Sequence, residues 1–224
     1  MAPEFVKPEW TDPARQAAFE VWLNAMALSF GLKPDTLRLA SADASFRRYF
    51  RVDCAPQDDG AITRIIMDAP PALENSEPFV RIDRLFGEAG LNVPRILAWD
   101  EAQGFMLLND VGTQTLLQAA DLENPSANLP QFQKAIDSLL KLQLASKPGV
   151  LPNYDDAMLR RELQLFPDWY IAKHRGITLS DAQQQTLNQA FDLIVAQNLA
   201  APQVYVHRDY MPRNLMIPLR ADEP

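Results

Sequence analysis

With 224 residues, the chain is long enough for one large or two small domains, and its 47% hydrophobic and 22% charged content is ordinary for a globular protein. A net charge of −8 argues against non-specific binding to nucleic acid or to an anionic membrane, because both need a basic surface. The single cysteine, Cys54, excludes an intrachain disulfide and favours a reducing cytoplasm. With only two histidines, the composition favours a hard cation held by oxygen ligands over a zinc site.

The first half of the chain predicts a mostly antiparallel sheet with helices. Asp12 and Pro13 form the start signal of a helix that Gly31 ends. A change to period two then predicts strands, and a helix interrupts them. The expected order is two strands within residues 37–53, a third over 61–68, a helix over 78–90, and a hairpin of residues 93–99 and 104–108.

The turn at residues 41–45 joins the first two strands and contains no glycine, so it is not a glycine-rich phosphate loop. Its small side chains and backbone N–H groups would still allow a phosphate to approach. Arg47 and Arg48 follow it and point to opposite faces of a strand, so only one of them can easily face a ligand. A solvated hairpin with arginines on its surface is an equally weighted alternative.

After Gly112 the composition becomes helical. Helices are predicted over residues 132–144, over 155–173 with Pro167 dividing or kinking the helix, and after the cap residue Ser180. The chain thus predicts a β-rich N-terminal lobe (residues 1–109), a linker near 109–113 and a helical C-terminal lobe (residues 110–224), with a ligand in the cleft between them. A plain interdomain connector is the alternative for the linker.

Residues 204–217 hold the most informative pattern. Val204, Tyr205 and Val206 predict a buried strand, and residues 215–217 predict a second strand after a polar loop. The loop carries His207, Asp209 and Asn214 at the spacing H-x-D-x-x-x-x-N, which is typical of the catalytic loop of kinases. There the carboxylate orients the attacking hydroxyl and accepts its proton, the amide oxygen ligates Mg²⁺, and the histidine supports the loop. The alternative is a polar turn with a capped aspartate and an ordinary ion pair to Arg208.

Several stretches together resemble the aminoglycoside-phosphotransferase and choline-kinase branch of the kinase-like folds. The resemblance is closest to the anomeric N-acetylmuramate and N-acetylglucosamine kinases of bacterial cell-wall recycling. The stretches are A-D-A-S-F-R-R-Y-F-R (42–51), I-M-D-A-P-P (66–71), P-F-V (78–80), G-F-M-L-L-N-D-V-G (104–112), R-R-E-L-Q-L-F-P-D-W-Y (160–170) and V-H-R-D-Y-M-P-R-N-L-M (206–216).

The resemblance implies an α+β, two-lobed protein-kinase-like fold and an enzyme that uses ATP and Mg²⁺. It would phosphorylate the anomeric C1 hydroxyl of a free amino sugar to the sugar 1-phosphate in peptidoglycan recycling, in the cytoplasm, with no nucleic-acid or membrane partner. Carried over by position, Asp209 and His207 are catalytic and Asn214 is a metal ligand. Nucleotide binding falls to Ser45, Phe46, Arg47 and Arg48 at the phosphates and to Leu107, Leu108, Asn109 and Asp110 as the hinge.

The resemblance also places Glu162, Asp168 and Tyr170 where a sugar pocket would be lined. For Glu162, an ion pair with Arg160 or Arg161 is the alternative. The preferred amino sugar, the preferred nucleotide and the oligomeric state stay open, with a monomer as the expectation.

Two departures from the kinase pattern bear on activity. Met67 and Asp68 occupy the region where the third strand of ordinary kinases carries a lysine, and the chain stops at Pro224, before a second metal-binding aspartate is found. Asp222 has no apolar strand around it and is therefore not a candidate for this second aspartate. Because the aspartate is missing, the chain is expected to be truncated. The alternatives are a kinase for another small hydroxyl substrate, of the aminoglycoside or choline type, and a catalytically dead nucleotide-binding pseudokinase.

Overall fold

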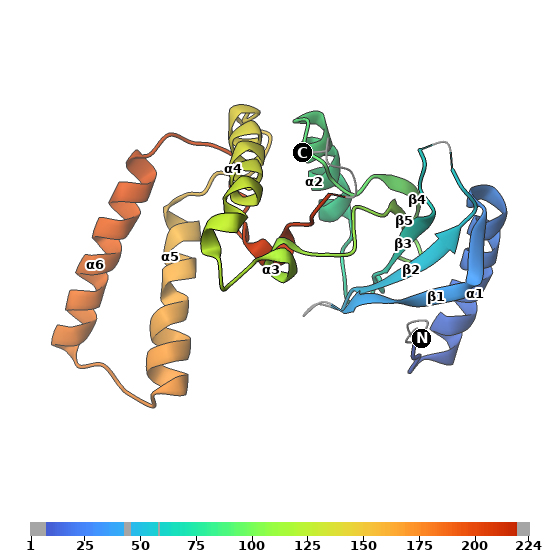
Figure 1. The fold of residues 1–224 in the computed structure, drawn as a ribbon. Helices are drawn as coiled ribbons and strands as arrows, with labels where there is room; N and C mark the ends of the chain where they lie inside the picture. The colour runs from blue at the N-terminus through green and yellow to red at the C-terminus, as the bar shows by residue number, and fades with distance from the viewer. Residues whose placement is uncertain (1–7, 43–45, 58, 219–224) are drawn as a thin grey trace. The chain divides into compact units, whose positions relative to one another are not determined.

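The computed structural model describes residues 8–42, 46–57 and 59–218, and the chain forms two compact units (Figure 1). The first unit comprises Met1–Leu142 and Arg208–Pro224, and the second comprises Gln143–His207. The lobe boundary predicted between residues 109 and 110 lies inside the first unit and stays a prediction. In the described part of the chain, no helix has both the length and the apolar character that crossing a membrane requires.

A five-stranded sheet forms the centre of the first unit, and every neighbouring pair of strands in it is antiparallel, as predicted. The first strand begins earlier than the predicted residue 37, and the order of the sheet is β1-β2-β3-β5-β4. The strands are β1 (Leu32–Ala42), β2 (Arg48–Cys54), β3 (Thr63–Asp68), β4 (Ile96–Asp100) and β5 (Phe105–Asn109).

Helix α1 (Pro13–Phe30) covers one face of this sheet. Its predicted ends are confirmed: the Asp12 carboxylate accepts hydrogen bonds from the N–H groups of Ala14 and Arg15, and Gly31 has the left-handed φ of 62°. Phe19 packs edge-on against Phe105 of β5, with ring centroids 5.4 Å apart. The buried residues of this face, from helix and strands together, are Phe19, Trp22, Leu23, Leu32, Phe50, Val52, Cys54, Ile66, Phe105 and Leu107.

Helix α2 (Glu77–Glu88) covers the opposite face, where Phe79 and Val80 pack against Met67, Met106 and Leu108. Because side chains alternate along a strand, residues 48, 50 and 52 of β2 share the α1 face, whereas residues 49 and 51 share the α2 face. The alternation of β2 therefore decides on which side of the sheet each of its arginines lies.

The rest of the first unit is mainly helical. A short helix α3 (Leu116–Ala119) begins at a capping box in which Thr115 and Gln118 satisfy each other's backbone N–H groups. The 3₁₀ segment η1 (Pro125–Asn128) precedes α4 (Leu129–Leu144), and η3 (Pro212–Asn214) lies in the predicted catalytic loop. Helix α4 carries the chain from the first unit into the second.

The second unit consists of α5 (Asp156–Leu165), the π-helical segment η2 (Phe166–His174) and α6 (Asp181–Ala200). The predicted division at Pro167 is confirmed, because this proline lacks an N–H and the regular α-helical pattern ends beside it. Arg160 of α5 reaches Asp192 of α6 at 2.9 Å and also contacts Asp156 in its own helix.

The strands predicted at residues 204–206 and 215–217 are wrong. In the described part of the chain these residues contribute only an isolated bridge between Met216 and Thr115. A strand needs a neighbouring strand for its backbone groups, and here the N–H of Tyr205 donates instead to the Ser146 hydroxyl at 2.8 Å. Val204 and Val206 stay 39% and 52% exposed, so an apolar run alone did not report a buried strand.

The turn between β4 and β5 supports a prediction about stability. Gly104 has a φ of 70°, and a Cβ on it would lie 1.9 Å from the carbonyl oxygen of Ala69. Gly90 has a φ of 78° with nothing within 4 Å of its Cβ position, so it is a matched control. We expect Gly90→Ala to lower the free energy of unfolding by about 1–2 kcal/mol, the usual penalty of the left-handed conformation. Gly104→Ala should lower it by several kcal/mol, because backbone must also shift. Urea unfolding measures both, and equal losses would contradict the proposed clash.

Candidate functional site

The structure brings together the two residues on which the predicted catalytic loop depends. The Nδ2 atom of Asn214 donates to the Oδ2 atom of Asp209 at 2.7 Å and to its backbone carbonyl at 3.0 Å. The short η3 turn makes this possible, since the N–H of Asn214 also donates to the carbonyl of Met211. The Asp209 carboxylate is thereby held in place while it stays exposed.

Arg208, beside Asp209, has a φ of 73°, and among the described residues it is the one non-glycine residue with a positive φ. Such a backbone costs about 1–3 kcal/mol, persists where its surroundings impose it, and clusters at functional sites. Two residues further on, the hydroxyl of Tyr210 donates to the carbonyl of Ala135 in α4 and so anchors the loop. Burial raises the pKa of Tyr210, so this hydroxyl remains a donor. His207, the predicted supporting residue, is half-buried and belongs to the second unit.

The residues after Asn214 are joined to the linker that follows β5. The N–H of Leu116 donates to the carbonyl of Leu215 at 2.7 Å, and the N–H of Ile217 donates to the carbonyl of Gln114 at 2.9 Å. Gly112 allows this approach, because a Cβ there would lie 2.7 Å from the carbonyl oxygen of Ile217. Backbone hydrogen bonds thus connect the linker with the residues that follow the predicted catalytic loop.

The donor atoms of this loop suit a hard cation. With its nitrogen committed to Asp209, the amide of Asn214 retains an oxygen, and the exposed carboxylate of Asp209 offers further oxygens. Mg²⁺ is commonly bound by one or two protein oxygens and completed by water and substrate phosphates. In the described ranges, no group of three or more His, Cys, Asp or Glu side chains converges on a metal position.

The predicted hinge residues divide between the sheet and the linker. Leu107 and Leu108 lie inside β5, which pairs with β3 on one side and β4 on the other, so their backbone groups face neighbouring strands. The N–H of Asn109 donates to the carbonyl of Arg95 at 3.0 Å. A backbone edge for an adenine therefore begins no earlier than Asp110, and the assignment of all four residues to nucleotide binding stays a prediction.

The Asp110 side chain holds the start of the linker against the sheet. It accepts hydrogen bonds from Arg51 at 2.6 and 3.1 Å, from the Thr63 hydroxyl at 2.8 Å and from the N–H of Gly112 at 3.1 Å. Burial raises the pKa of Asp110, but the hydrogen bonds from Arg51, Thr63 and Gly112 together outweigh it, so the pKa lies below its ordinary value. The carboxylate is structural rather than available to a ligand.

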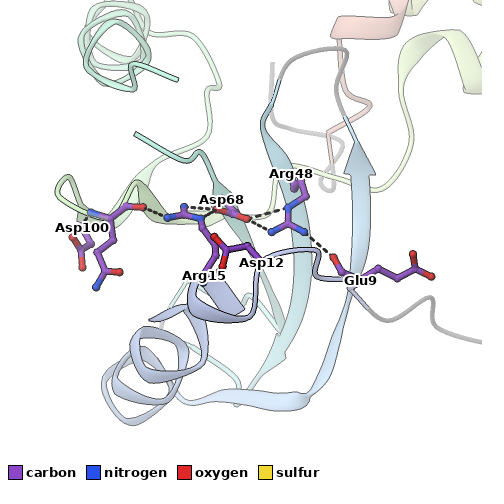
Figure 2. A network of polar contacts seen from close by, with 7 residues as sticks. Glu9, Asp12, Arg15, Arg48, Asp68 and Asp100 are labelled. Carbon is purple, nitrogen blue, oxygen red and sulfur yellow. Dashed lines mark hydrogen bonds and ion pairs between the residues drawn. The ribbon is translucent and has the colours of Figure 1, made fainter. Parts of the chain in front are cut away.

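Figure 2 shows the carboxylate of Asp68 held between two arginines from different elements. Arg15 of α1 donates to Oδ1 through Nε at 3.0 Å and through Nη2, and Arg48 of β2 donates to Oδ2 in the same way. The remaining Nη1 atoms donate to the carbonyls of Gln103, at 2.7 Å, and Glu9, at 2.9 Å. Asp68 is fully buried at the end of β3, in the region where the kinase pattern would place a lysine.

The network lies on the α1 face of the sheet, among aromatic rings. The guanidinium of Arg48 lies 4.1 Å from the ring centroid of Trp10, and that of Arg15 lies 4.3 Å from the ring centroid of Phe105. Arg48, one of the predicted phosphate ligands, is thus committed to Asp68 and to the polypeptide around it.

Arg47, the other candidate, lies on the α2 side. Its guanidinium is 5.8 Å from the ring centroid of Phe79, and its Nε atom is 3.4 Å from the Glu74 carboxylate. Phe46, whose side chain is exposed, donates its backbone N–H to the same carboxylate at 3.0 Å. Ser45 falls outside the described residues, so the structure does not place it.

The three predicted sugar-binding residues all belong to the second unit. Glu162 lies 3.8 Å from Arg161, whereas Arg160 pairs elsewhere. Asp168 accepts a hydrogen bond from the Gln164 amide at 2.9 Å. The half-exposed Tyr170 ring stacks at 5.6 Å on Phe166 and on His174.

Sequence reasoning missed the partners of the charged residues: Arg15 for Asp68, Arg51 for Asp110, and Glu74 for Arg47. Strand alternation could have placed Arg48 and Asp68 on one face, but no local signal identifies a partner 53 residues away, as Arg15 is. It also missed Asp83 on α2. Burial raises the pKa of Asp83 to about 6, and its Oδ1 atom lacks a hydrogen-bond partner among the described residues.

A cavity of about 320 Å³ lies beside α1, away from the predicted site residues, none of which lines it. Its walls come from the N-terminal segment, α1 and β1, with Trp10 and Phe19 as apolar surface and Glu20 and Asp35 as the charged residues.

Comparison with protein families identifies one match along most of the chain. A family model described as the phosphotransferase enzyme family matches residues 36–224. The match includes the whole sheet from the middle of β1 onward, the helices of the second unit and the loop that holds Asp209 and Asn214.

Curated relatives with similar sequences are named N-acetylmuramate/N-acetylglucosamine kinase. The relative from Pseudomonas aeruginosa is 45% identical over 214 residues, covering 92% of this chain and 61% of its own. The relative from Pseudomonas putida is 49% identical over 181 residues (81% and 51%), and that from Neisseria meningitidis serogroup B is 40% identical over 204 residues (91% and 58%). The chain therefore spans between 51% and 61% of the length of these relatives.

The Asp68 network supports a prediction about stability. Asp68→Asn should lower the free energy of unfolding by about 3–5 kcal/mol, because it removes the negative charge that two largely buried guanidinium groups share. Asp53→Asn is the matched control, since Asp53 is 35% exposed and pairs with a single arginine, Arg38. It should cost about 1 kcal/mol or less. Chemical unfolding of both variants tests the difference, and a similar loss in each would show that the buried network adds nothing special.

The depressed pKa of Asp110 predicts an acid-dependent loss of stability. Its ion pair contributes fully above the unfolded-state pKa of about 3.9, and the contribution is lost as the pH falls through this value toward the lower folded-state pKa. The stability difference between the wild type and Asp110→Asn should therefore be largest near neutral pH and shrink as the pH falls from about 5 to 3. Thermal unfolding across this range measures it. The exposed-site variant Asp35→Asn should follow the wild-type curve, and a constant difference for Asp110→Asn would contradict the assignment.

Proposed function

The chain belongs to the phosphotransferase enzyme family, and on this premise we propose that it carries an ATP-dependent kinase activity toward an amino sugar. The acceptor is the anomeric C1 hydroxyl of N-acetylmuramate or N-acetylglucosamine, and the product is the sugar 1-phosphate, which serves peptidoglycan recycling in the cytoplasm. The names and the 40–49% identity of the three relatives support this substrate class.

One observation carries the proposal: the hydrogen bond that joins Asp209 to Asn214 at the spacing H-x-D-x-x-x-x-N. An exposed carboxylate in a fixed position can orient a sugar hydroxyl and accept its proton. An anomeric hydroxyl is more acidic than an ordinary alcohol, so little basicity is required of Asp209. Most of the rate would then come from positioning and from neutralisation of charge on the phosphates.

Asn214 would hold Mg²⁺ through its amide oxygen, and the ion would neutralise developing charge on the transferred phosphoryl group. On the protein side, we propose that Phe46 and Arg47 face the phosphates, because Arg48 is committed to Asp68. The hinge for the adenine would follow β5, from Asp110 onward. His207 remains the proposed support of the loop, and Glu162, Asp168 and Tyr170 remain the proposed sugar contacts.

We expect Asp209→Asn to lower the turnover number by about 10²- to 10⁴-fold, the usual contribution of a positioned general base, while ATP affinity stays within a few-fold. The measurement is ADP release with Mg-ATP and N-acetylmuramate or N-acetylglucosamine, with Asp35→Asn as a surface control. Unchanged turnover in Asp209→Asn would remove this residue from catalysis.

The same assay separates the competing functions. ADP release with an aminoglycoside or choline, but with neither amino sugar, would favour a kinase for another small hydroxyl substrate. Stabilisation by ATP without ADP release from any acceptor would favour a nucleotide-binding pseudokinase.

A further inference from the structure

Glu74 lies in the turn between β3 and α2. It contacts Phe46 and Arg47, two of the residues predicted to bind the nucleotide phosphates. Its Oε1 atom accepts the backbone N–H of Phe46 at 3.0 Å, and its Oε2 atom lies 3.4 Å from the Nε atom of Arg47. Both side chains are largely buried, with 15% of Glu74 and 23% of Arg47 exposed. A carboxylate thus sits at a position defined by one N–H group and one guanidinium group.

These two donors are of the kinds that bind phosphate oxygens. Backbone N–H groups in a turn form anion sites, and arginine binds phosphates and carboxylates with the same planar fork. Oε1 of Glu74 accepts the hydrogen bond from Phe46 and Oε2 forms an ion pair with Arg47, so the two oxygens occupy the place that two phosphate oxygens would take. A nucleotide phosphate carries more charge and more acceptor oxygens than a carboxylate, so it can compete for them.

The local backbone allows Glu74 to leave. Its N–H donates to the carbonyl of Pro70 at 2.9 Å, and α2 begins later, at Glu77. The contact to Phe46 and Arg47 is therefore made by a side chain on a turn, and its displacement breaks no helix or strand. The contact between Arg48 and Asp68 cannot be displaced in the same way, because Asp68 is buried and both of its oxygens are already bound.

From this arrangement, and resting on the proposed function, we propose that Glu74 is an intramolecular competitor of the nucleotide. In the ligand-free protein its carboxylate occupies the anion position at Phe46 and Arg47, and the nucleotide phosphates displace it on binding. Glu74 therefore lowers the affinity for every anion at this position: weakly bound anions are excluded, whereas a polyphosphate binds strongly enough to displace the carboxylate.

The test is the affinity of the 224-residue chain for inorganic tripolyphosphate, measured by isothermal titration calorimetry in the wild type and in Glu74→Gln. Removing a competing carboxylate and its repulsion should tighten binding by about tenfold. Glu77→Gln is the matched control, because it removes the same charge three residues away, from an exposed ion pair with Arg81. It should change the affinity by less than about twofold.

The Arg47→Gln variant completes the design. In this background, binding should be weak and Glu74→Gln should give little further gain. An unchanged or weaker affinity in Glu74→Gln would overturn the proposal, since Glu74 would then be a positioning partner of Arg47. The absence of tripolyphosphate binding in every variant would overturn it as well. Because this readout needs neither sugar nor turnover, it fails independently of the kinase assay.

Discussion

The buried carboxylate of Asp68 imposes the constraint on which the rest of the first unit depends. A charge with no access to water is tolerated only when it is paired and hydrogen-bonded, and here Arg15 and Arg48 satisfy both oxygens. Arg15 lies 53 residues from Asp68 and Arg48 lies 20 residues from it, so the pairing fixes α1 and β2 against the end of β3. It also commits Arg48 to the α1 face of the sheet.

A second buried carboxylate, that of Asp110, is likewise paired with an arginine, at the other end of the strands. Asp110 binds Arg51 of β2 and Thr63 of β3, and so holds the start of the linker against the sheet. Beyond it, Gly112 lets the residues after the predicted catalytic loop approach the linker, where Leu215 and Ile217 form backbone hydrogen bonds. These hydrogen bonds, taken together, connect the sheet with the loop that contains Asp209.

Much of the fold could be predicted from local sequence patterns, because the interactions that begin, end or divide a helix or strand are made by residues close together in the sequence. The cap at Asp12 and the stop at Gly31, the alternation along β2 and β3, and the division at Pro167 each depend on residues within one or two turns. Residues 204–206 show the limit. Their apolar run satisfied the pattern for a strand, but a strand exists only with a partner, and partners are supplied by residues far away in the sequence.

The antiparallel sheet, the helices with their caps, and the spacing that places Asp209 and Asn214 in one loop can all be derived from the sequence, since they follow from periodicity, capping chemistry and short-range geometry. Which partner each charged side chain has, by contrast, follows from the tertiary structure. Arg47 and Arg48 are neighbours of the same type, but alternation sends one toward Glu74 and the other toward Asp68. The difference arises because burial makes an unpaired charge costly, and the partner of each charge comes from another element of the fold.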